Sequence, residues 1–565
     1  MATSTGPGTN MGTNTGTSMG TGTDTGSATG SANGSAGGPG AVVPGAIERA
    51  RSTAAPAGWD YAPAPESLKV AIAPEYGHFI NGRFVAPRAR SSKGEWFATI
   101  NPATEQALSR VAQGSEADVD AAVKAARAAL PAWSSCPPLE RGKLLFRLAR
   151  RIQERSRELA VLETMDSGKP IKESRDVDLP LVAAHFFYYA GWADKLEYAF
   201  PGYFDAREPA RRVPPAIGVC AQVIPWNFPL LMAAWKLAPA LACGNTCVLK
   251  PAETTPLTAL RLAEIIQELD FPPGVVNIVT GDGATGAALV SHPGVDKIAF
   301  TGSTDVGKKI AMRVAERVEE GDEGVDEQRR SSRRGAPGLT LELGGKSPHI
   351  IFADAAIDQA IEGIISGIYF NQGEVCCAGS RLLVEESVLP QVVAKLEHRL
   401  ARLRVGDPMD KNTDVGAINS RAQLDRVEHY LELGQREGAK LTCPSGSPTG
   451  GFARGYFCRP CFFTDVQPSH AIARDEIFGP VLAVMSFRTP EEAILRANNT
   501  PYGLAAGVWT DKGSKMLDVA RKLKAGVVWC NTYNKFDPSS PFGGYRESGF
   551  GREGGVHGLA GYVHH

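Results

Sequence analysis

Two adjacent cysteines, Cys376 and Cys377, stand in the stretch FNQGEVCCAGS, which runs from Phe370 to Ser380. Its small and polar residues predict a loop. A thiolate is the side-chain nucleophile that adds readily to a carbonyl carbon near neutral pH. A lone cysteine in a large chain is more often a buried structural residue. The pair by itself therefore leaves two interpretations open: a nucleophile, or thiols that only pack.

The chain before this loop alternates between apolar runs and helical patterns. From residue 217, IGVCAQVIPW, TCVLKPA, GVVNIVTG and KIAFTGS predict strands, and helices are predicted over 230–242, 255–269 and 304–318. This alternation indicates βαβ units and a parallel sheet with helices on both faces. Ligands of such sheets bind at the carboxyl ends of the strands, where PWN, KPAE and TGS lie.

A second alternation begins after Leu339 and surrounds the cysteine loop. It contains LTLELGG, HIIFAD, a helix over 357–370, RLLVEE and PVLAVMSF. Farther on, Thr489 is expected to cap a helix, with Pro490 in its first position and Glu492 completing a capping box. The pattern predicts a second α/β domain.

Length and charge restrict the kind of ligand. The 565 residues suffice for about two to four domains. Sixty basic and 61 acidic side chains leave a formal charge of −1, too little to attract nucleic acid or an anionic membrane. No apolar run approaches the roughly 20 residues that span a bilayer, and the first residues show neither a charged n-region nor an apolar h-region. We expect a cytoplasmic protein with a small-molecule ligand, no nucleic-acid partner and no membrane partner.

The ten cysteines are spread through the chain without a framework spacing, which predicts reduced thiols. Cys458 and Cys461 form a CxxC in GYFCRPCFF. A zinc site needs a second ligand pair, and no nearby Cys or His pair supplies one. No metal is therefore expected.

Two segments have compositions that oppose folding. Residues 1–55 are mostly Gly, Thr, Ser and Ala, too poor in apolar side chains to offset the entropy of ordering them, which predicts a disordered tail. The stretch EEGDEGVDEQRRSSRRGAPG, residues 319–338, is acidic and then basic and predicts a solvated loop.

Six strings that occur in order resemble the aldehyde dehydrogenase superfamily, and most of all its hydrolytic, NAD-dependent branch. They are VIPWNFPLLMAAWKLAPALACGNTCVLKPAETTP, FTGSTDVG, LELGGKSP, FNQGEVCCAGSR, EIFGPV and SPFGGYRESGFGRE. The resemblance runs from about Phe79 to the C-terminus. It implies a doubly wound parallel-sheet cofactor domain, a second α/β catalytic domain and a small β oligomerisation element. The implied boundaries are 56–197 and 217–344 for the NAD-binding domain, 345–547 for the catalytic domain, and 198–216 and 548–565 for the oligomerisation element.

The resemblance assigns catalytic roles that agree with the chemistry of aldehyde oxidation. Cys376 matches the family's nucleophile, and Cys377 matches the neighbouring non-catalytic position. Asn227 matches the donor to the oxyanion, with the backbone N–H of Cys376 as its companion. Glu342 matches the general base that activates water to hydrolyse the thioester, and desolvation between an apolar strand and two glycines would raise its pKa.

No side chain accepts a hydride, so a nicotinamide is required. GSTDVG opens a helix after a strand, where free N–H groups can receive a pyrophosphate. A carboxylate at Glu253 accepts a 2′-hydroxyl and repels a 2′-phosphate, which favours NAD over NADP. The positions that match the family's cofactor contacts are Trp226, Lys250, Glu253, Gly302, Ser303, Gly307, Glu476 and Phe478.

Aromatic residues are usually core residues in a large α/β protein, but five of them match the family's substrate tunnel and favour an apolar or mixed aldehyde. They are Phe228, Trp235, Phe370, Phe536 and Phe542. A homodimer or homotetramer is expected. Three alternatives stay open: a CoA-acylating relative, which would not need Glu342; an inactive scaffold member, which would typically lack the nucleophile or the base; and a cysteine hydrolase, although no obvious His pairs with Cys376.

Overall fold

The structure is a computed structural model, and it describes residues 62–88, 94–205, 208, 210, 212–319, 337–443 and 454–564. The predicted tail over 1–55 and nearly all of the charged stretch over 319–338 lie outside these residues. Within the described ranges, no helix is both long and apolar enough to cross a membrane.

The first sheet has eight strands in the order β18-β10-β9-β6-β7-β8-β2-β3. Its five central strands, β10 to β8 in that order, are parallel, and β18, β2 and β3 pair antiparallel at the edges. Because the strand order reverses between β6 and β9, this is a doubly wound sheet with a switch point there. The strands are β2 (His78–Ile80), β3 (Arg83–Val85), β6 (Val219–Val223), β7 (Thr246–Lys250), β8 (Val276–Ile278), β9 (Lys297–Thr301), β10 (Gly338–Glu342) and β18 (Gly549–Phe550).

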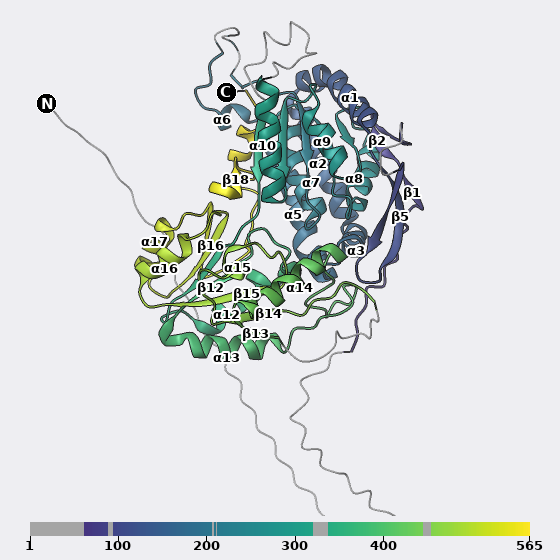
Figure 1. Cartoon of the computed structure of the whole chain (residues 1–565). Coiled ribbons are helices and arrows are strands. Elements are labelled where there is room, and N and C mark those ends of the chain that lie inside the picture. Colours follow the sequence, from purple (N-terminus) through teal and green to yellow (C-terminus); the bar gives the residue numbers. More distant parts are fainter. Residues whose placement is uncertain are drawn as a thin grey trace, which may run out of the picture. The chain divides into compact units, whose positions relative to one another are not determined.

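Helices cover both faces of this sheet, as its apolar strands require (Figure 1). In β7, Cys247 and Leu249 belong to one apolar core, whereas Val248 belongs to the other. The first core contains α2 (Pro138–Glu154), α5 (Leu179–Trp192), α7 (Pro229–Ala242) and α8 (Leu257–Glu268). The second contains α1 (Glu116–Ser135), α9 (Gly283–Ser291) and α10 (Thr304–Glu319).

The strand predicted at LTLELGG joins the first sheet rather than the second alternation. It forms β10, in which Leu341 pairs with Phe300 and Glu342 with Thr301 of β9. The apolar alternation alone could not show this, because a buried parallel strand has the same apolar signature in either sheet; the boundary of 217–344 implied by the resemblance does group the strand with the first sheet.

The second sheet has seven strands in the order β13-β14-β15-β12-β11-β16-β17, all parallel except the edge strand β13. They are β11 (Pro348–Ile351), β12 (Arg381–Glu385), β13 (Lys440–Thr442), β14 (Cys461–Thr464), β15 (Val481–Phe487), β16 (Ala505–Trp509) and β17 (Val527–Cys530). Helices α12 (Ile357–Ile368), α13 (Leu389–Leu400), α14 (Arg421–Arg436), α16 (Pro490–Asn498) and α17 (Gly513–Lys522) accompany it. The predicted α/β fold class is confirmed.

The start of α16 confirms two of its three predicted signals. Thr489 caps the helix by accepting the N–H of Glu492 at 3.3 Å, and Pro490 is its first residue. The capping box is wrong, because the Glu492 carboxylate accepts the N–H of Arg488 at 2.8 Å instead of that of Thr489.

A third, small sheet contains β1 (Glu75–Tyr76), β5 (Gln106–Ala112) and β4 (Trp96–Asn101). The other α-helices of the described residues are α3 (Ser156–Ser167), α4 (Ile171–Glu173), α6 (Leu196–Ala199), α15 (Ala471–Arg474) and α18 (His557–Ala560). Near the end of the chain, Val563 forms a bridge with Ala216. The predicted domain boundaries and oligomerisation element stay predictions.

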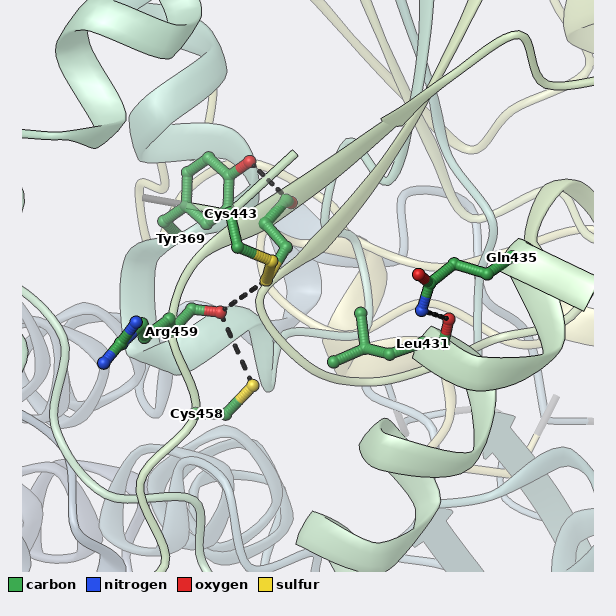
Figure 2. Close-up of a disulfide and its surroundings, with 7 residues drawn as sticks. Tyr369, Leu431, Gln435, Cys443, Cys458 and Arg459 are labelled. Atoms are coloured by element: carbon green, nitrogen blue, oxygen red, sulfur yellow. Dashed lines mark hydrogen bonds between the residues drawn. A yellow bond between two sulfur atoms is a disulfide. The ribbon is translucent and has the colours of Figure 1, made fainter. Parts of the chain in front are cut away.

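The prediction that all ten cysteines are thiols is wrong for Cys443 and Cys461, which form a disulfide (Figure 2). The other eight are free. The pairing was hidden in the sequence because the two residues face each other only once β13 and β14 align as antiparallel neighbours.

Candidate active site

The three predicted catalytic side chains line one cavity of about 760 Å³. Asn227 lies between β6 and α7, and Glu342 is the last residue of β10, so both stand at carboxyl ends of strands beside the switch point. Cys376 comes from the loop between α12 and β12 of the second sheet. The cavity therefore combines residues from both sheets.

Hydrogen bonds tie Asn227 to the loop of Cys376. The Asn227 side-chain amide donates to the backbone oxygen of Glu374 at 2.7 Å. The amide of Asn371 donates to the backbone oxygens of Asn227 at 3.0 Å and Glu374 at 3.2 Å. Asn371 and Gln372 have φ of 48° and 55°, a left-handed conformation that costs free energy in residues other than glycine and occurs often at active sites. These bonds hold the loop in that conformation.

The Glu342 carboxylate is buried, and neither of its oxygens has a hydrogen-bond partner among the described residues. Burial, followed by the neighbouring Glu553 carboxylate, raises the pKa of Glu342 well above its ordinary value. A carboxylate with a raised pKa is a better proton acceptor near neutral pH than a solvated one.

Cys376 is partly buried, and Cys377 is fully buried. The neighbouring Cys377 thiol and then burial raise the pKa of Cys376 well above its ordinary value. The thiol of Cys377 donates a hydrogen bond to Oδ1 of Asn534 at 3.6 Å. In this structure Cys376 is a thiol at neutral pH, so its attack on a substrate requires a proton acceptor.

The predicted tunnel residues all line the same cavity. The rings of Phe228 and Phe370 stack with their centroids 6.2 Å apart. The ring of Trp235 meets that of Phe542 edge-on at 5.4 Å and that of Phe536 at 6.2 Å. Together they form an aromatic wall beside Cys376.

Only some of the predicted cofactor residues line this cavity. Those on its wall are Trp226, Gly302, Ser303, Glu476 and Phe478, whereas Lys250, Glu253 and Gly307 are not among its lining residues. The structure gives Gly307 a packing role, since a Cβ there would lie 2.4 Å from the side chain of Leu343.

Two glycines after Glu342 let other elements approach the site closely. A Cβ on Gly344 would lie 2.1 Å from a carboxylate oxygen of Glu476, and the N–H of Gly345 donates to the other oxygen at 3.0 Å. A Cβ on Gly345 would lie 2.6 Å from the backbone oxygen of Cys376. The glycines of LELGG are thus required by close packing around the cavity.

Comparison with known proteins shows which family this chain belongs to. The model of the aldehyde dehydrogenase family matches residues 89–565. The chain belongs to the aldehyde dehydrogenase family. Mitochondrial aldehyde dehydrogenase of Homo sapiens is 47% identical over 472 residues, which cover 83% of this chain and 87% of that protein. Retinaldehyde dehydrogenase 3 of Rattus norvegicus is 46% identical over 493 residues, or 86% of this chain and 91% of that protein.

Two solved structures resemble this aldehyde dehydrogenase along most of its length. The NAD⁺ complex of an aldehyde dehydrogenase from Bacillus cereus matches with a TM-score of 0.78 and 42% identity, covering 88% of this chain and 98% of that one. Indole-3-acetaldehyde dehydrogenase in complex with NAD⁺ matches with a TM-score of 0.78 and 39% identity, covering 88% and 96%. The predicted family is confirmed.

The structure of the dehydrogenase also reveals charged groups that the sequence analysis missed. The ammonium of Lys236 contacts the Glu553 carboxylate and donates to the Thr301 hydroxyl at 2.7 Å. The carboxylates of Glu553 and Glu342 interact in turn. One signal was available: Lys236 is a charged residue in an otherwise apolar helix, α7.

Proposed function

We propose that this aldehyde dehydrogenase oxidises an aldehyde to the carboxylic acid with NAD, through a thioester on Cys376. The observation that carries the proposal is that Cys376, Asn227 and Glu342 line the same cavity, next to an aromatic wall. NAD is supported by the two similar structures, which are both NAD⁺ complexes.

Cys376 is the nucleophile of this reaction. Its sulfur adds to the aldehyde carbon, and the carbonyl oxygen gains the negative charge. Asn227 donates to that oxygen from a position held by the loop itself, so little reorganisation accompanies the reaction. The thiol proton passes to water, and Glu342 is left to act in the later hydrolysis, where its raised pKa suits it to accept a proton.

Bound NAD would supply the acceptor for the hydride that leaves the substrate carbon. The substrate is then a thioester on Cys376. Glu342 takes a proton from a water molecule, and the oxygen of that water adds to the thioester carbon. The bond from this carbon to the Cys376 sulfur then breaks, which releases the carboxylic acid and leaves a thiolate on Cys376. The cation of Lys236, in contact with Glu553, offsets the negative charge that remains beside Glu342.

The residues at the cavity suit a dinucleotide. The rings of Trp226 and Phe478 meet edge-on with their centroids 5.2 Å apart, and Phe478 has a φ of 61°, unusual for a bulky residue. Gly302 and Ser303 lie where α10 begins, a place suited to a phosphate group. Trp226 and Phe478 would adjoin the nicotinamide, and Glu476 its ribose.

Lys250 and Glu253 would hold the adenosine ribose. The buried ammonium of Lys250 donates to the backbone oxygen of Pro251 at 2.7 Å and lies 3.9 Å from the Glu253 carboxylate. That carboxylate is 51% exposed, so it can accept hydrogen bonds from a ligand at the surface. Gly307 stays a predicted cofactor contact, and its lack of a side chain also makes room for Leu343.

The aromatic wall supports an apolar or mixed aldehyde as substrate. We further propose a homo-oligomer, dimer or tetramer, in which the segments joined by the Ala216–Val563 bridge contribute to the interface. A cytoplasmic location is proposed as well, supported by the eight cysteines that are free in the structure.

Replacing Glu342 by Gln tests the proposal and its CoA-acylating alternative. The variant should form the thioester and stall, giving a burst of NADH no larger than the number of active sites, with the acyl group on the peptide of Cys376. Absence of both burst and adduct would assign Glu342 to the first step. Wild-type turnover would refute its role as base, and acyl-CoA formation by the wild type would then support the alternative.

A further inference from the structure

Cys443 and Cys461 face each other across two neighbouring strands. In the β13–β14 pair, Thr442 is opposite Phe462, so the next positions bring Cys443 opposite Cys461. Their Cα atoms are 4.6 Å apart and their sulfurs are bonded. Cys443 is exposed at the edge of the sheet, whereas residue Cys461 is only 2% exposed. A reagent in solution therefore meets the Cys443 sulfur first.

A third cysteine lies next to this disulfide. Cys458 is free and buried, and its thiol donates to the backbone oxygen of Arg459 at 3.5 Å. The Cys461 sulfur lies 3.0 Å from the same oxygen (Figure 2). The sulfurs of Cys458 and Cys461 are therefore no farther apart than these two distances combined. Both sulfurs thus adjoin the same backbone oxygen.

The main chain of Cys461 joins this cluster to the active site. Its N–H donates to the backbone oxygen of Pro480 at 2.9 Å, and its backbone oxygen accepts the hydroxyl of Tyr369 at 3.0 Å, a bond drawn in Figure 2. Tyr369 directly precedes Phe370 of the aromatic wall, and Pro480 lies two residues after Phe478 of the cavity. A shift of Cys461 would act on both segments.

These two segments also touch each other beside the cavity. A Cβ on Gly373, in the loop that leads to Cys376, would lie 2.2 Å from the backbone oxygen of Gly479. There is no free space at this contact, so a displacement of either segment must move the other. The shape of the cavity thus depends on the contact between Gly373 and Gly479, and the main chain of Cys461 is hydrogen-bonded to both of the segments that make it.

We propose that Cys443, Cys458 and Cys461 form a thiol–disulfide exchange site, separate from the nucleophile, whose oxidation state changes the activity of the enzyme through the main chain of Cys461. A dithiol reductant opens the site. One of its thiolates bonds to the Cys443 sulfur and Cys461 leaves as a thiolate; the second reductant thiolate then displaces Cys443 and closes the reductant's own disulfide. Two protons and two electrons pass from the dithiol to the protein.

A low-molecular-weight disulfide closes the site by the reverse route. The Cys443 thiolate displaces one thiolate from that reagent and forms a mixed disulfide, and the Cys461 thiolate then attacks the Cys443 sulfur and releases the second thiolate. Internal exchange needs no external reagent: the Cys458 thiolate bonds to the Cys461 sulfur and Cys443 leaves.

The burial of Cys458 controls the speed of that internal exchange. Burial raises the pKa of Cys458 to about 12, so only a small fraction is thiolate at neutral pH. Below this pKa the thiolate fraction grows about tenfold per pH unit. Exchange from Cys443–Cys461 to Cys458–Cys461 should be slow near pH 7 and accelerate steadily toward pH 9.

The first experiment maps the pairing. The full-length enzyme is equilibrated with dithiothreitol or with hydroxyethyl disulfide, alkylated in denaturant and analysed by peptide mass spectrometry. Within the cluster, we expect the Cys443–Cys461 disulfide after oxidation, alkylation of all three cysteines after reduction, and growth of Cys458–Cys461 as the oxidised enzyme is held at pH 9. A Cys443–Cys461 pair that resists reduction in the folded enzyme, or a Cys458–Cys461 pair that never forms, would overturn the exchange site.

The second experiment tests the link to the active site. Hydrogen exchange of residues 369–380 and 476–480, a readout that does not depend on turnover, should differ between the oxidised and reduced forms. In the same samples kcat/KM for NAD should change by about fivefold or more, the size of a typical coupling between two sites. Identical exchange in two forms whose pairing differs would refute the coupling, whatever the activity.

Two variants separate this site from direct modification of Cys376. Cys443→Ser removes the native pair, so its kinetics should be the same after reducing treatment and after brief oxidation at pH 7. Cys530→Ser removes a partly buried free cysteine outside the cluster and should respond as the wild type does. A response of Cys443→Ser equal to that of the wild type would place the effect elsewhere and refute the proposal.

Discussion

The side-chain amide of Asn227 donates a hydrogen bond to the backbone oxygen of Glu374, two residues before Cys376, at 2.7 Å. One residue from the first sheet is thereby fixed against the loop that carries the nucleophile from the second. The amide that would stabilise the oxyanion also sets its own distance from the sulfur.

Asn227→Ala should lower kcat by about 10²- to 10³-fold, the usual effect of removing one donor to an oxyanion. Steady-state kinetics of NADH formation would measure it. Asn534→Ala is a matched control, because Asn534 lines the same cavity but contacts Cys377. An equal loss in both variants would contradict a specific role for Asn227.

Cys376→Ala should abolish dehydrogenase activity, with a fall in kcat of at least about a thousandfold. Cys377→Ala should retain most of it, because the buried Cys377 thiol points to Asn534. Steady-state kinetics of the two purified variants would show which cysteine is the nucleophile, and circular dichroism would confirm that both variants are folded. Comparable losses in two folded variants would show that the nucleophile is misassigned.

Alkylation of Cys376 in the cofactor-free enzyme should be slow at pH 7 and should still be rising above about pH 8.5, where an ordinary thiol is already half ionised. The sign follows from the raised pKa of Cys376, which lowers the thiolate fraction at a given pH. Iodoacetamide labelling followed by peptide mass spectrometry would give the rate at each pH. A plateau below pH 8 would contradict this.

NAD should be preferred to NADP by at least about tenfold in kcat/KM, because a carboxylate beside a 2′-phosphate costs free energy. The Glu253 side chain is 51% exposed, so salt should reduce the preference by screening. Glu253→Gln should narrow the gap. Glu316→Gln, which alters a carboxylate that is 55% exposed on α10, should not. An unchanged preference in Glu253→Gln would show that the ribose binds elsewhere.

The sequence by itself determined the family, the α/β class and most of the strands of both sheets. Apolar periodicity and helix signals such as Thr489 and Pro490 act over a few neighbouring residues, so they can be read locally. Three separate motifs, PWNFP, LELGG and EVCCAGS, also identified the catalytic candidates that the structure brings into one cavity. Their roles rest on those motifs and on the geometry together.

Only the tertiary structure decided which distant residues meet. Lys236 and Glu553 are 317 positions apart, and no local pattern predicts their contact beside Glu342. The packing of Gly307 against Leu343 and the pairing of Cys443 with Cys461 share this cause. Each depends on strand order and on the approach of separate elements, which follow from the balance of packing and chain entropy over the whole molecule.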